Sequence, residues 1–381
     1  MIKIQISIIS LVVLGSISLF LRGIDYLYYL DTTRVLYAFR LLSPFNENAE
    51  GLTNYYKPLD SIFAILPFIW IWLDIFIAIQ CMVWWKGFWV LPLVFLIGAR
   101  LRALQEVAHV AVHKGLCPSK RWQWFLGNIF FQFPCFKPDM HGRFRRHVLS
   151  HHAHPNTLDQ DPNIHRMIRL GFVPGMTSIR FYLFLLHPIL YCGLHETLVA
   201  CIRNFIINEN CYIFYLRIVL TSIAFYIIYM LFGVFGLVFG YLVPLIIIYP
   251  WFSWLSTLAE HRWFVPCDEV TTHLEKECIN GRPTEYKGIL GWLIKHGISP
   301  GPDHYHLAHS LCPIARWNYL PTIDRALKAM YPCYEQYKSQ GLLIPSKSSG
   351  CPSALSELRE RMTNPSRYPL ASWVDKIRDY S

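Results

Sequence analysis

The sequence predicts an all-α, polytopic membrane protein with about four transmembrane helices in two hairpins and a cytosolic helical cap. Hydrophobic residues make up 54% of the 381 residues, and charged residues make up only 16%. A water-soluble protein of this length needs more charge to cover its surface. The mean hydropathy of +0.30 and several apolar runs of spanning length indicate a membrane location.

The N-terminal region, residues 1–60, is predicted to combine an apolar helix with a polar surface segment. The apolar run at residues 4–21 follows only Lys3 and has no small-residue cleavage pattern, so it is a weak signal-peptide candidate. A spanning helix and an interfacial helix both fit its length. Residues 22–60 are polar, mixed in charge and rich in turn-forming residues, which is typical of a surface segment.

Two apolar hairpins are predicted within the central region, residues 61–335. Residues 62–81 and 88–99 form the first hairpin and are joined by a short turn. Residues 212–231 and 234–254 form the second.

Two other segments are not predicted to span. Residues 178–200 are apolar but are interrupted by His187 and Pro188, which favours an interfacial or re-entrant helix. Residues 336–381 are charged and broken by proline, and we predict a cytosolic C-terminal tail without chemistry.

Basic residues predict the orientation of the hairpins. Lysines and arginines are concentrated in residues 100–180 and 262–295, and such residues are enriched on the cytosolic side of membranes. The same bias explains the net charge of +10, so no nucleic-acid partner is predicted. Asp74 lies inside the first hairpin, where a carboxylate is costly. A place near the lumenal end, facing a neighbouring helix, is favoured over a functional role.

Most of the 16 histidines fall into four groups at the predicted cytosolic ends of helices. The groups are HVAVH at residues 109–113, RHVLSHHAH at 146–154, EHRW at 260–263 and DHYHLAHS at 303–310. Neutral imidazole is a good ligand for iron, zinc or copper. So many imidazoles exceed what one ion binds, which favours two ions. A nitrogen-rich two-metal site can reduce O2 to an oxidant that attacks C–H bonds.

Helical spacing places some of these histidines on shared faces. Residues four apart on an α-helix lie on one face, which joins His109 to His113 and His147 to His151. His152 is turned by about 100° from its neighbour and can reach a different ion.

Two other classes of protein were weighed against this interpretation. A structural origin accounts for isolated histidine pairs but not for four groups at one membrane face. A zinc hydrolase typically shows His-Glu-x-x-His, whereas residues 109–113 carry no carboxylate between the two histidines. A zinc-dependent membrane hydrolase or an inactive metal-binding membrane protein remains the alternative of another class.

Together these residues resemble the membrane fatty acid desaturase/hydroxylase superfamily, the histidine-box di-iron enzymes. The order HxxxH, HxxxHH and a late HxxH matches, and so does the context. Asp159-Gln160-Asp161-Pro162 follows the second box, Glu260-His261 follows the last span, and Asn318-Tyr319-Leu320-Pro321 follows the third box. The resemblance covers residues 60 to 335.

The resemblance implies two iron ions, and the division of ligands between them stays open. The implied ligands are His109, His113, His147, His151, His152, His261, His306 and His309. It also implies outer-shell roles for His154, Asp159 and Asp161, which would orient a ligand or a loop. For the two aspartates, a solvated turn is the alternative.

The third box departs from the family pattern. Ser310 stands where the second of two adjacent histidines is usual, and serine is a poor iron ligand. His304 is a candidate substitute ligand. It lies two residues before His306 and off its helical face, so it would need a turn to reach the same ion.

The activity that the resemblance implies is O2-dependent desaturation of a fatty-acyl or related lipid chain. A hydroxylase or ketolase acting on a lipid, alkane or carotenoid would use the same ligands and is the alternative. No cytochrome b5, flavin or ferredoxin motif is visible, so a separate electron donor of the ferredoxin or cytochrome b5 type is expected. We expect a multi-pass protein of the bacterial inner membrane or the endoplasmic reticulum, with a cytosolic active site.

Overall fold

The structure is a computed structural model that describes residues 2–33, 35, 56–206, 210–267, 272–344 and 350–378. Within these ranges every regular element is helical except two strands of two residues each, which confirms the predicted all-α class. The chain forms two compact units. Unit 1 contains the described residues of Met1–Asp31, Tyr56–His141 and Pro188–Phe252, and unit 2 contains those of Thr32–Tyr55, Gly142–His187 and Ser253–Ser381.

Unit 1 holds most of the long apolar helices. Its elements are α1 (Ile2–Tyr28), α3 (Asp60–Phe63), α4 (Leu66–Trp85), η2 (Gly87–Trp89), α5 (Val90–Val112), α6 (Lys120–Gly127), η3 (Asn128–Gln132), α10 (Tyr191–Ile206), α11 (Cys211–Leu237), η6 (Val238–Leu242) and η7 (Pro244–Ile248). Three further helices have residues in both units: α7 (Met140–Phe144), η5 (His187–Ile189) and α12 (Tyr249–Glu260).

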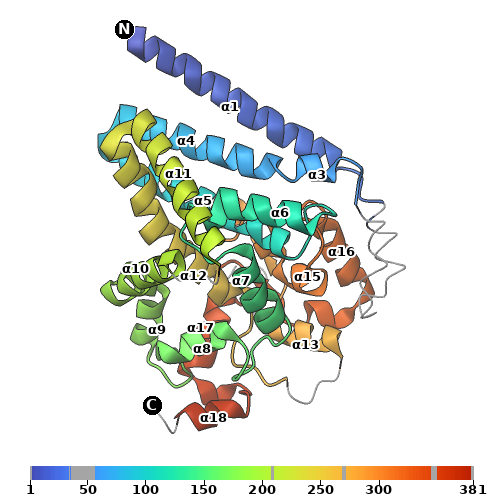
Figure 1. The fold of residues 1–381 in the computed structure, drawn as a ribbon. Coiled ribbons are helices and arrows are strands. Elements are labelled where there is room, and N and C mark those ends of the chain that lie inside the picture. The colour runs from blue at the N-terminus through green and yellow to red at the C-terminus, as the bar shows by residue number, and fades with distance from the viewer. Residues whose placement is uncertain are drawn as a thin grey trace. The chain divides into compact units, whose positions relative to one another are not determined.

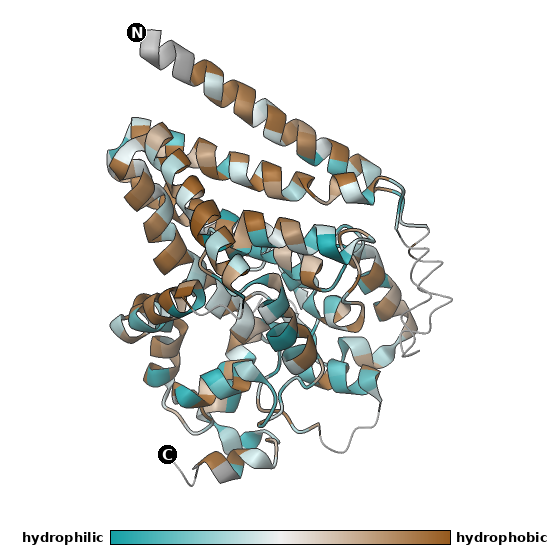
Figure 2. Ribbon diagram, viewed as in Figure 1, coloured by the Kyte–Doolittle hydropathy of each residue, from teal (hydrophilic) through white to brown (hydrophobic). Residues whose placement is uncertain are grey.

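Four helical stretches of the described chain are long and apolar enough to cross a membrane. They are Ile8–Tyr28, Asp60–Trp85, Gly87–Val112 and Cys211–Glu260. In Figure 2 the hydrophobic colour follows α1, α4 and α11. The first stretch lies in α1 and overlaps the run 4–21, for which a spanning helix and an interfacial helix were both predicted as possible. The second and third form the predicted first hairpin, but the return helix α5 continues to Val112 and therefore carries His109.

The fourth stretch has 50 residues, far more than one crossing needs. A single crossing takes about 20 residues at a rise of about 1.5 Å per residue. Gly233 interrupts the stretch with φ 68° and ψ −170°, a backbone conformation that glycine adopts without steric cost. The chain doubles back after α11 (Figure 1). The stretch therefore supplies the second predicted hairpin.

The segment predicted to be interfacial or re-entrant is broken into short pieces. Residues 178–200 form α9 (Ser178–Leu185), η5 and most of α10. The longest of these helices, α10, has 16 residues. The break falls at His187 and Pro188, because proline lacks the N–H that a continuing helix needs.

Asp74 of α4 lies in a polar cluster among the apolar helices of unit 1. It pairs with Arg22 of α1, accepts a hydrogen bond from the Ser18 hydroxyl at 2.8 Å, and lies 3.5 Å from Arg100 of α5. Figure 1 shows α1 running alongside α4. Only 11% of the apolar window of α1 is buried, so this cluster is a main tie between α1 and the other helices.

Unit 2 consists of short helices and one small sheet. Its elements are η4 (Arg145–His152), α8 (Pro162–Arg169), α9, α13 (His273–Asn280), β1 (Thr284–Glu285), α14 (Gly288–Gly297), η8 (Gly301–Tyr305), α15 (His306–Leu311), α16 (Leu320–Met330), η9 (Pro332–Glu335), β2 (Ser339–Gln340), α17 (Ala354–Thr363), η10 (Pro365–Arg367) and α18 (Trp373–Arg378). The two strands pair in parallel, with Thr284 opposite Ser339.

The described part of the predicted tail, residues 336–381, is folded within unit 2. A capping box between Ser353 and Ser356 begins α17. The helix then buries Leu355, Leu358 and Met362, each with at most 1% of its surface exposed.

Candidate metal centre

The first histidine box lies at the end of α5 in unit 1. His109 and His113 are 4% and 5% exposed, and their ring centroids are 5.2 Å apart, as expected for residues four apart on a helix. His109 Nδ1 lies 2.7 Å from a Glu106 carboxylate oxygen. Arg102 pairs with the same carboxylate from one turn earlier. The Glu106 carboxylate thus fixes the orientation of a buried imidazole.

The second box differs from the predicted α-helical geometry. Residues 145–152 form a π-helix, η4, in which hydrogen bonds join residues five apart. His147 and His152 are therefore the closer pair, with ring centroids 4.6 Å apart and Nε2 atoms 3.1 Å apart. The centroids of His147 and His151, which were expected to share a face, are 5.6 Å apart. The wider turn of the π-helix explains why His152, and not His151, is the closer partner of His147. Such π-helical turns often occur at functional sites.

Three imidazoles from three segments of unit 2 point their Nε2 atoms at one another. The Nε2 atoms of His151 and His261 are 3.1 Å apart, and those of His261 and His306 are 3.0 Å apart. All three side chains are buried, with at most 4% exposed. Adjacent nitrogen ligands that bind one ion at about 2.1 Å lie about 3 Å from each other. The spacing therefore fits a set of ligands around a metal ion.

Two more rings of unit 2 extend this set. His152 lies 5.5 Å from His309 and 6.5 Å from His306, measured between ring centroids. His309 is fully buried. The histidines of η4, of the segment directly after α12 and of α15 thus converge within unit 2, whereas His109 and His113 belong to unit 1.

The Asp161 carboxylate contacts one of these rings, that of His151. Asp161 Oδ1 lies 3.0 Å from His151 Nδ1, and the backbone N–H groups of Asn156 and Asn163 also donate to Asp161. Burial alone would raise the pKa of Asp161, but His151 and these N–H groups lower it. Burial likewise opposes a charged His151, yet Asp161 raises the pKa of that imidazole. Hydrogen bonding of the far ring nitrogen to a carboxylate is typical of metal-binding histidines.

Burial favours the neutral form of two other imidazoles of unit 2. It lowers the pKa of His309 to about 3, and burial together with the neighbouring His151 lowers the pKa of His261 to about 3. A neutral imidazole is the form that binds a metal ion, so no proton has to leave these two rings near neutral pH.

Glu260 and Asp303 lie near the rings but have no role predicted from the sequence. Oxygen and nitrogen atoms of His151, Glu260 and His261 lie within 4.8 Å of one another, and the same holds for Glu260, Asp303 and His306. A local signal existed, because Glu260 directly precedes His261 and Asp303 precedes His306 by three residues, as Glu106 precedes His109.

Ser310 of the third box lies next to the carboxyl group of Glu277, which no local sequence pattern indicates. Ser310 and Glu277 of α13 are 5% and 2% exposed. Burial raises the pKa of Glu277 to about 7, while His151 and the Ser310 hydroxyl act in the opposite direction. An acidic side chain therefore lies beside the position where the family pattern has a histidine.

The remaining predicted residues lie less centrally. His154 and Asp159 are exposed, and Asp159 lies in a solvated turn. Of the three predicted outer-shell residues, Asp161 is the one that contacts a predicted ligand within the described part of the chain. Burial lowers the pKa of His304 to about 4, and its ring packs on Tyr305 with centroids 4.1 Å apart. Among the described residues it belongs to none of the groups that could hold an ion.

An all-helical membrane protein with buried, converging histidines has the features of a membrane oxidoreductase with a candidate metal centre. Residues 84–340 match the fatty acid desaturase family, and the chain belongs to this family. It is also similar to dihydrorhizobitoxine desaturase of Bradyrhizobium elkanii, with 28% identity over 294 residues, which covers 75% of this chain and 80% of the relative. The chain is thus an oxidoreductase of the fatty acid desaturase type.

Proposed function

We propose that the chain is a di-iron enzyme that uses O2 to introduce a double bond into a fatty-acyl or related lipid chain. The observation that carries the proposal is the row of Nε2 atoms of His151, His261 and His306, spaced 3.0 and 3.1 Å apart in a buried site. The balanced reaction converts –CH2–CH2–, O2, two electrons and two protons into –CH=CH– and two waters. Bound iron ions would supply the O2 chemistry.

In this proposal the side chains of the protein hold the metal ions and orient the ligand rings. His151, His261 and His306 would hold one ion, and the Asp161 carboxylate would keep the His151 ring in place. His147, His152 and His309 come from the same unit, and the family resemblance adds His109 and His113. The division of these other five ligands between the two ions stays open.

The substrate, the electron donor and the location belong to the same proposal. A lipid chain is the first substrate class. The similar protein of Bradyrhizobium elkanii is named for dihydrorhizobitoxine, which is a second candidate. Electrons come from a separate ferredoxin or cytochrome b5 type protein. The four apolar stretches support a multi-pass membrane protein, whose active site we assign to the cytosolic side.

The deciding experiment compares the products of cells that express the wild-type chain or the variant His151→Ala. A new unsaturated lipid that is absent with the variant supports desaturation. A new oxygenated lipid supports a hydroxylase or ketolase with the same ligands. Supplying dihydrorhizobitoxine in a parallel culture tests the second substrate. No new product from an abundant membrane-inserted wild-type protein would contradict the proposal.

Metal analysis separates the proposal from the other class of function. Two irons per purified chain support the oxidoreductase, whereas zinc alone supports a hydrolase. Ser310 motivates a third outcome, an inactive metal-binding protein. Activity that appears only in Ser310→His would support that outcome and contradict the proposal.

A further inference from the structure

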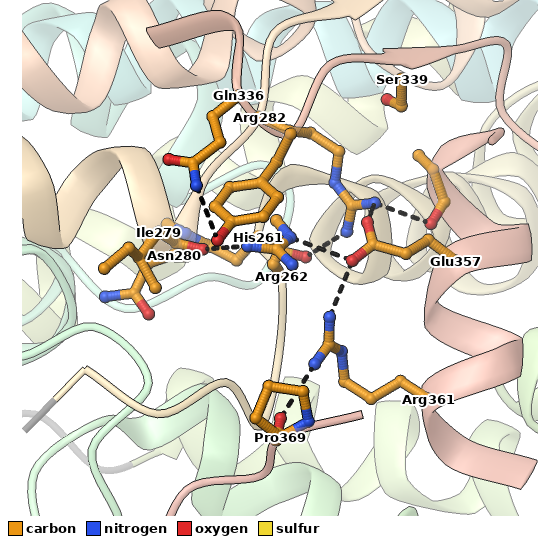
Figure 3. Close-up of polar contacts among 12 residues, drawn as sticks. His261, Arg262, Ile279, Asn280, Arg282, Gln336, Ser339, Glu357, Arg361 and Pro369 are labelled. Carbon is orange, nitrogen blue, oxygen red and sulfur yellow. Dashed lines mark hydrogen bonds and ion pairs between the residues drawn. The ribbon is translucent and has the colours of Figure 1, made fainter. Parts of the chain in front are cut away.

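A partly buried carboxylate in the C-terminal segment binds three arginines. Glu357 of α17 lies 3.0 Å from Arg262 Nε and 2.8 Å from Arg361 Nη2, and it also pairs with Arg282 (Figure 3). The three arginine side chains are between 1% and 8% exposed. Glu357 lies outside residues 84–340, the part of the chain that matches the family.

Two of these arginines donate hydrogen bonds to backbone carbonyls of His261 and of segments near it. Arg282 Nη2 donates a hydrogen bond to the His261 carbonyl at 3.1 Å, and Arg282 Nη1 donates to the Ala354 carbonyl of α17 at 3.2 Å. Arg262, the next residue in the chain, donates from Nη1 to the Ile279 carbonyl at 2.9 Å. The peptide that carries His261 is therefore fixed by guanidinium groups that Glu357 holds in turn.

Further contacts join the C-terminal segment to the residues that follow His261. The Ala371 N–H donates to the Phe264 carbonyl at 3.0 Å, and the ring of Phe264 packs on Trp373 with centroids 5.6 Å apart. The residues that follow His261 thus pack against both α17 and α18.

The charge balance of the cluster makes Glu357 the member whose removal has the largest effect. One carboxylate compensates three guanidinium groups in a buried site. Without it, the arginines repel one another and are costly to keep buried. They would separate or take up water, and Arg262 and Arg282 would lose their fixed positions beside His261.

We propose that Glu357 is a positioning residue for the metal centre, acting through Arg262 and Arg282 on the peptide that carries His261. The inference rests on the proposed function in so far as His261 is a metal ligand. It assigns a role to the C-terminal segment, which had been predicted to lack chemistry.

The test uses the full-length chain in detergent, with Glu357→Gln compared to wild type. The matched control is Glu360→Gln, on the same helix, where the carboxylate is 34% exposed and pairs with Arg359. Cobalt(II) titration reports affinity and, through its visible absorption spectrum, the ligand geometry. We expect Glu357→Gln to bind cobalt about tenfold or more weakly with an altered spectrum, as for other residues that orient ligands. Glu360→Gln should match wild type.

A second readout needs no metal. Backbone hydrogen exchange of the peptide around residues 261–265 should rise in metal-free Glu357→Gln and stay unchanged in Glu360→Gln. If wild type binds neither iron nor cobalt, the proposed function fails, while the exchange still decides whether Glu357 orders this peptide. Wild-type exchange in Glu357→Gln would overturn the inference.

A second variant keeps the test decisive if Glu357→Gln does not fold. Arg282→Lys keeps the positive charge but cannot donate to His261, Ala354 and Glu357 together, because lysine lacks the guanidinium fork. The same change in the cobalt spectrum and the same rise in exchange are expected. Wild-type behaviour of Arg282→Lys in both measurements would overturn the inference.

Discussion

Each unit surrounds one carboxylate with arginines, but the two clusters connect to different parts of the molecule. In unit 1, Asp74 pairs with Arg22 and Arg100 from neighbouring apolar helices. In unit 2, Glu357 pairs with three arginines, one of which directly follows His261 in the chain. Both clusters pair a carboxylate with guanidinium groups, but the residues next to the arginines differ.

The difference shows that an ion-pair cluster takes its role from what its partners hold. Arg22 belongs to α1, which carries no predicted ligand, and Arg100 lies nine residues before His109 on α5. The Asp74 cluster therefore ties helices together. The arginines around Glu357 donate to the backbone of His261 and of the residues near it, so that cluster also affects the candidate metal centre.

The largest expected effect comes from removing the ring that the Glu357 cluster positions. His261→Ala should reduce the iron content by about one ion per chain, because the Nε2 atoms of both His151 and His306 face this imidazole. Metal mass spectrometry of the purified protein measures the loss. Asp74→Asn, prepared in parallel, should keep the wild-type iron content. A full complement of iron in His261→Ala would show that this ring is no ligand.

A smaller effect on metal affinity is expected when Asp161, whose carboxylate contacts the His151 ring, is replaced. Asp161→Asn should weaken metal binding by about 10- to 100-fold, because the amide no longer stabilises the orientation of His151 with a charge. Competition with a chelator gives the dissociation constant. Asp159→Asn, a change on the same loop at an exposed residue, is the control and should leave the constant unchanged. Equal values for the two variants would exclude an orienting role for Asp161.

The Glu357 cluster should also give the protein a measurable sensitivity to acid. Burial alone would raise the pKa of Glu357, but the three arginines lower it to about 2, from 4.5 for an ordinary glutamate. Because the folded pKa is the lower one, this stability is present above pH 4.5 and is lost as the pH falls toward 2. The shift corresponds to about 3 kcal/mol.

Thermal unfolding in detergent between pH 2.5 and 6 measures this contribution. Glu357→Gln should unfold at a lower temperature at pH 6, and its melting temperature should fall less with acid than that of wild type. Glu360→Gln should follow the wild-type curve. Parallel curves for wild type and Glu357→Gln would contradict the lowered pKa.

The smallest effect is expected for the cluster in unit 1. Asp74→Asn should lower the stability by about 1 kcal/mol, since polar contacts between helices in a membrane contribute of that order. Ser18→Ala, which removes only the hydroxyl contact to Asp74, should have a weaker effect. Thermal unfolding in detergent compares the two variants. A loss of bound metal in Asp74→Asn would show that this cluster, too, acts on the metal centre.

The sequence by itself determined the membrane class, the two hairpins and the histidines of the candidate site. Apolar runs of spanning length and histidines at fixed spacing are local patterns, so each can be recognised within one segment. The break of the long helix at Gly233 and the cap of α8 by Asp161 follow equally local rules.

Only the tertiary structure decided which rings face each other and what holds them. The π-helix pairs His147 with His152, although α-helical spacing had joined His147 to His151. Glu277 lies beside Ser310, and Glu357 binds Arg262 across 95 positions of sequence. These contacts depend on how distant segments pack, and burial then sets the charges of the groups. No pattern within a single segment contains that information.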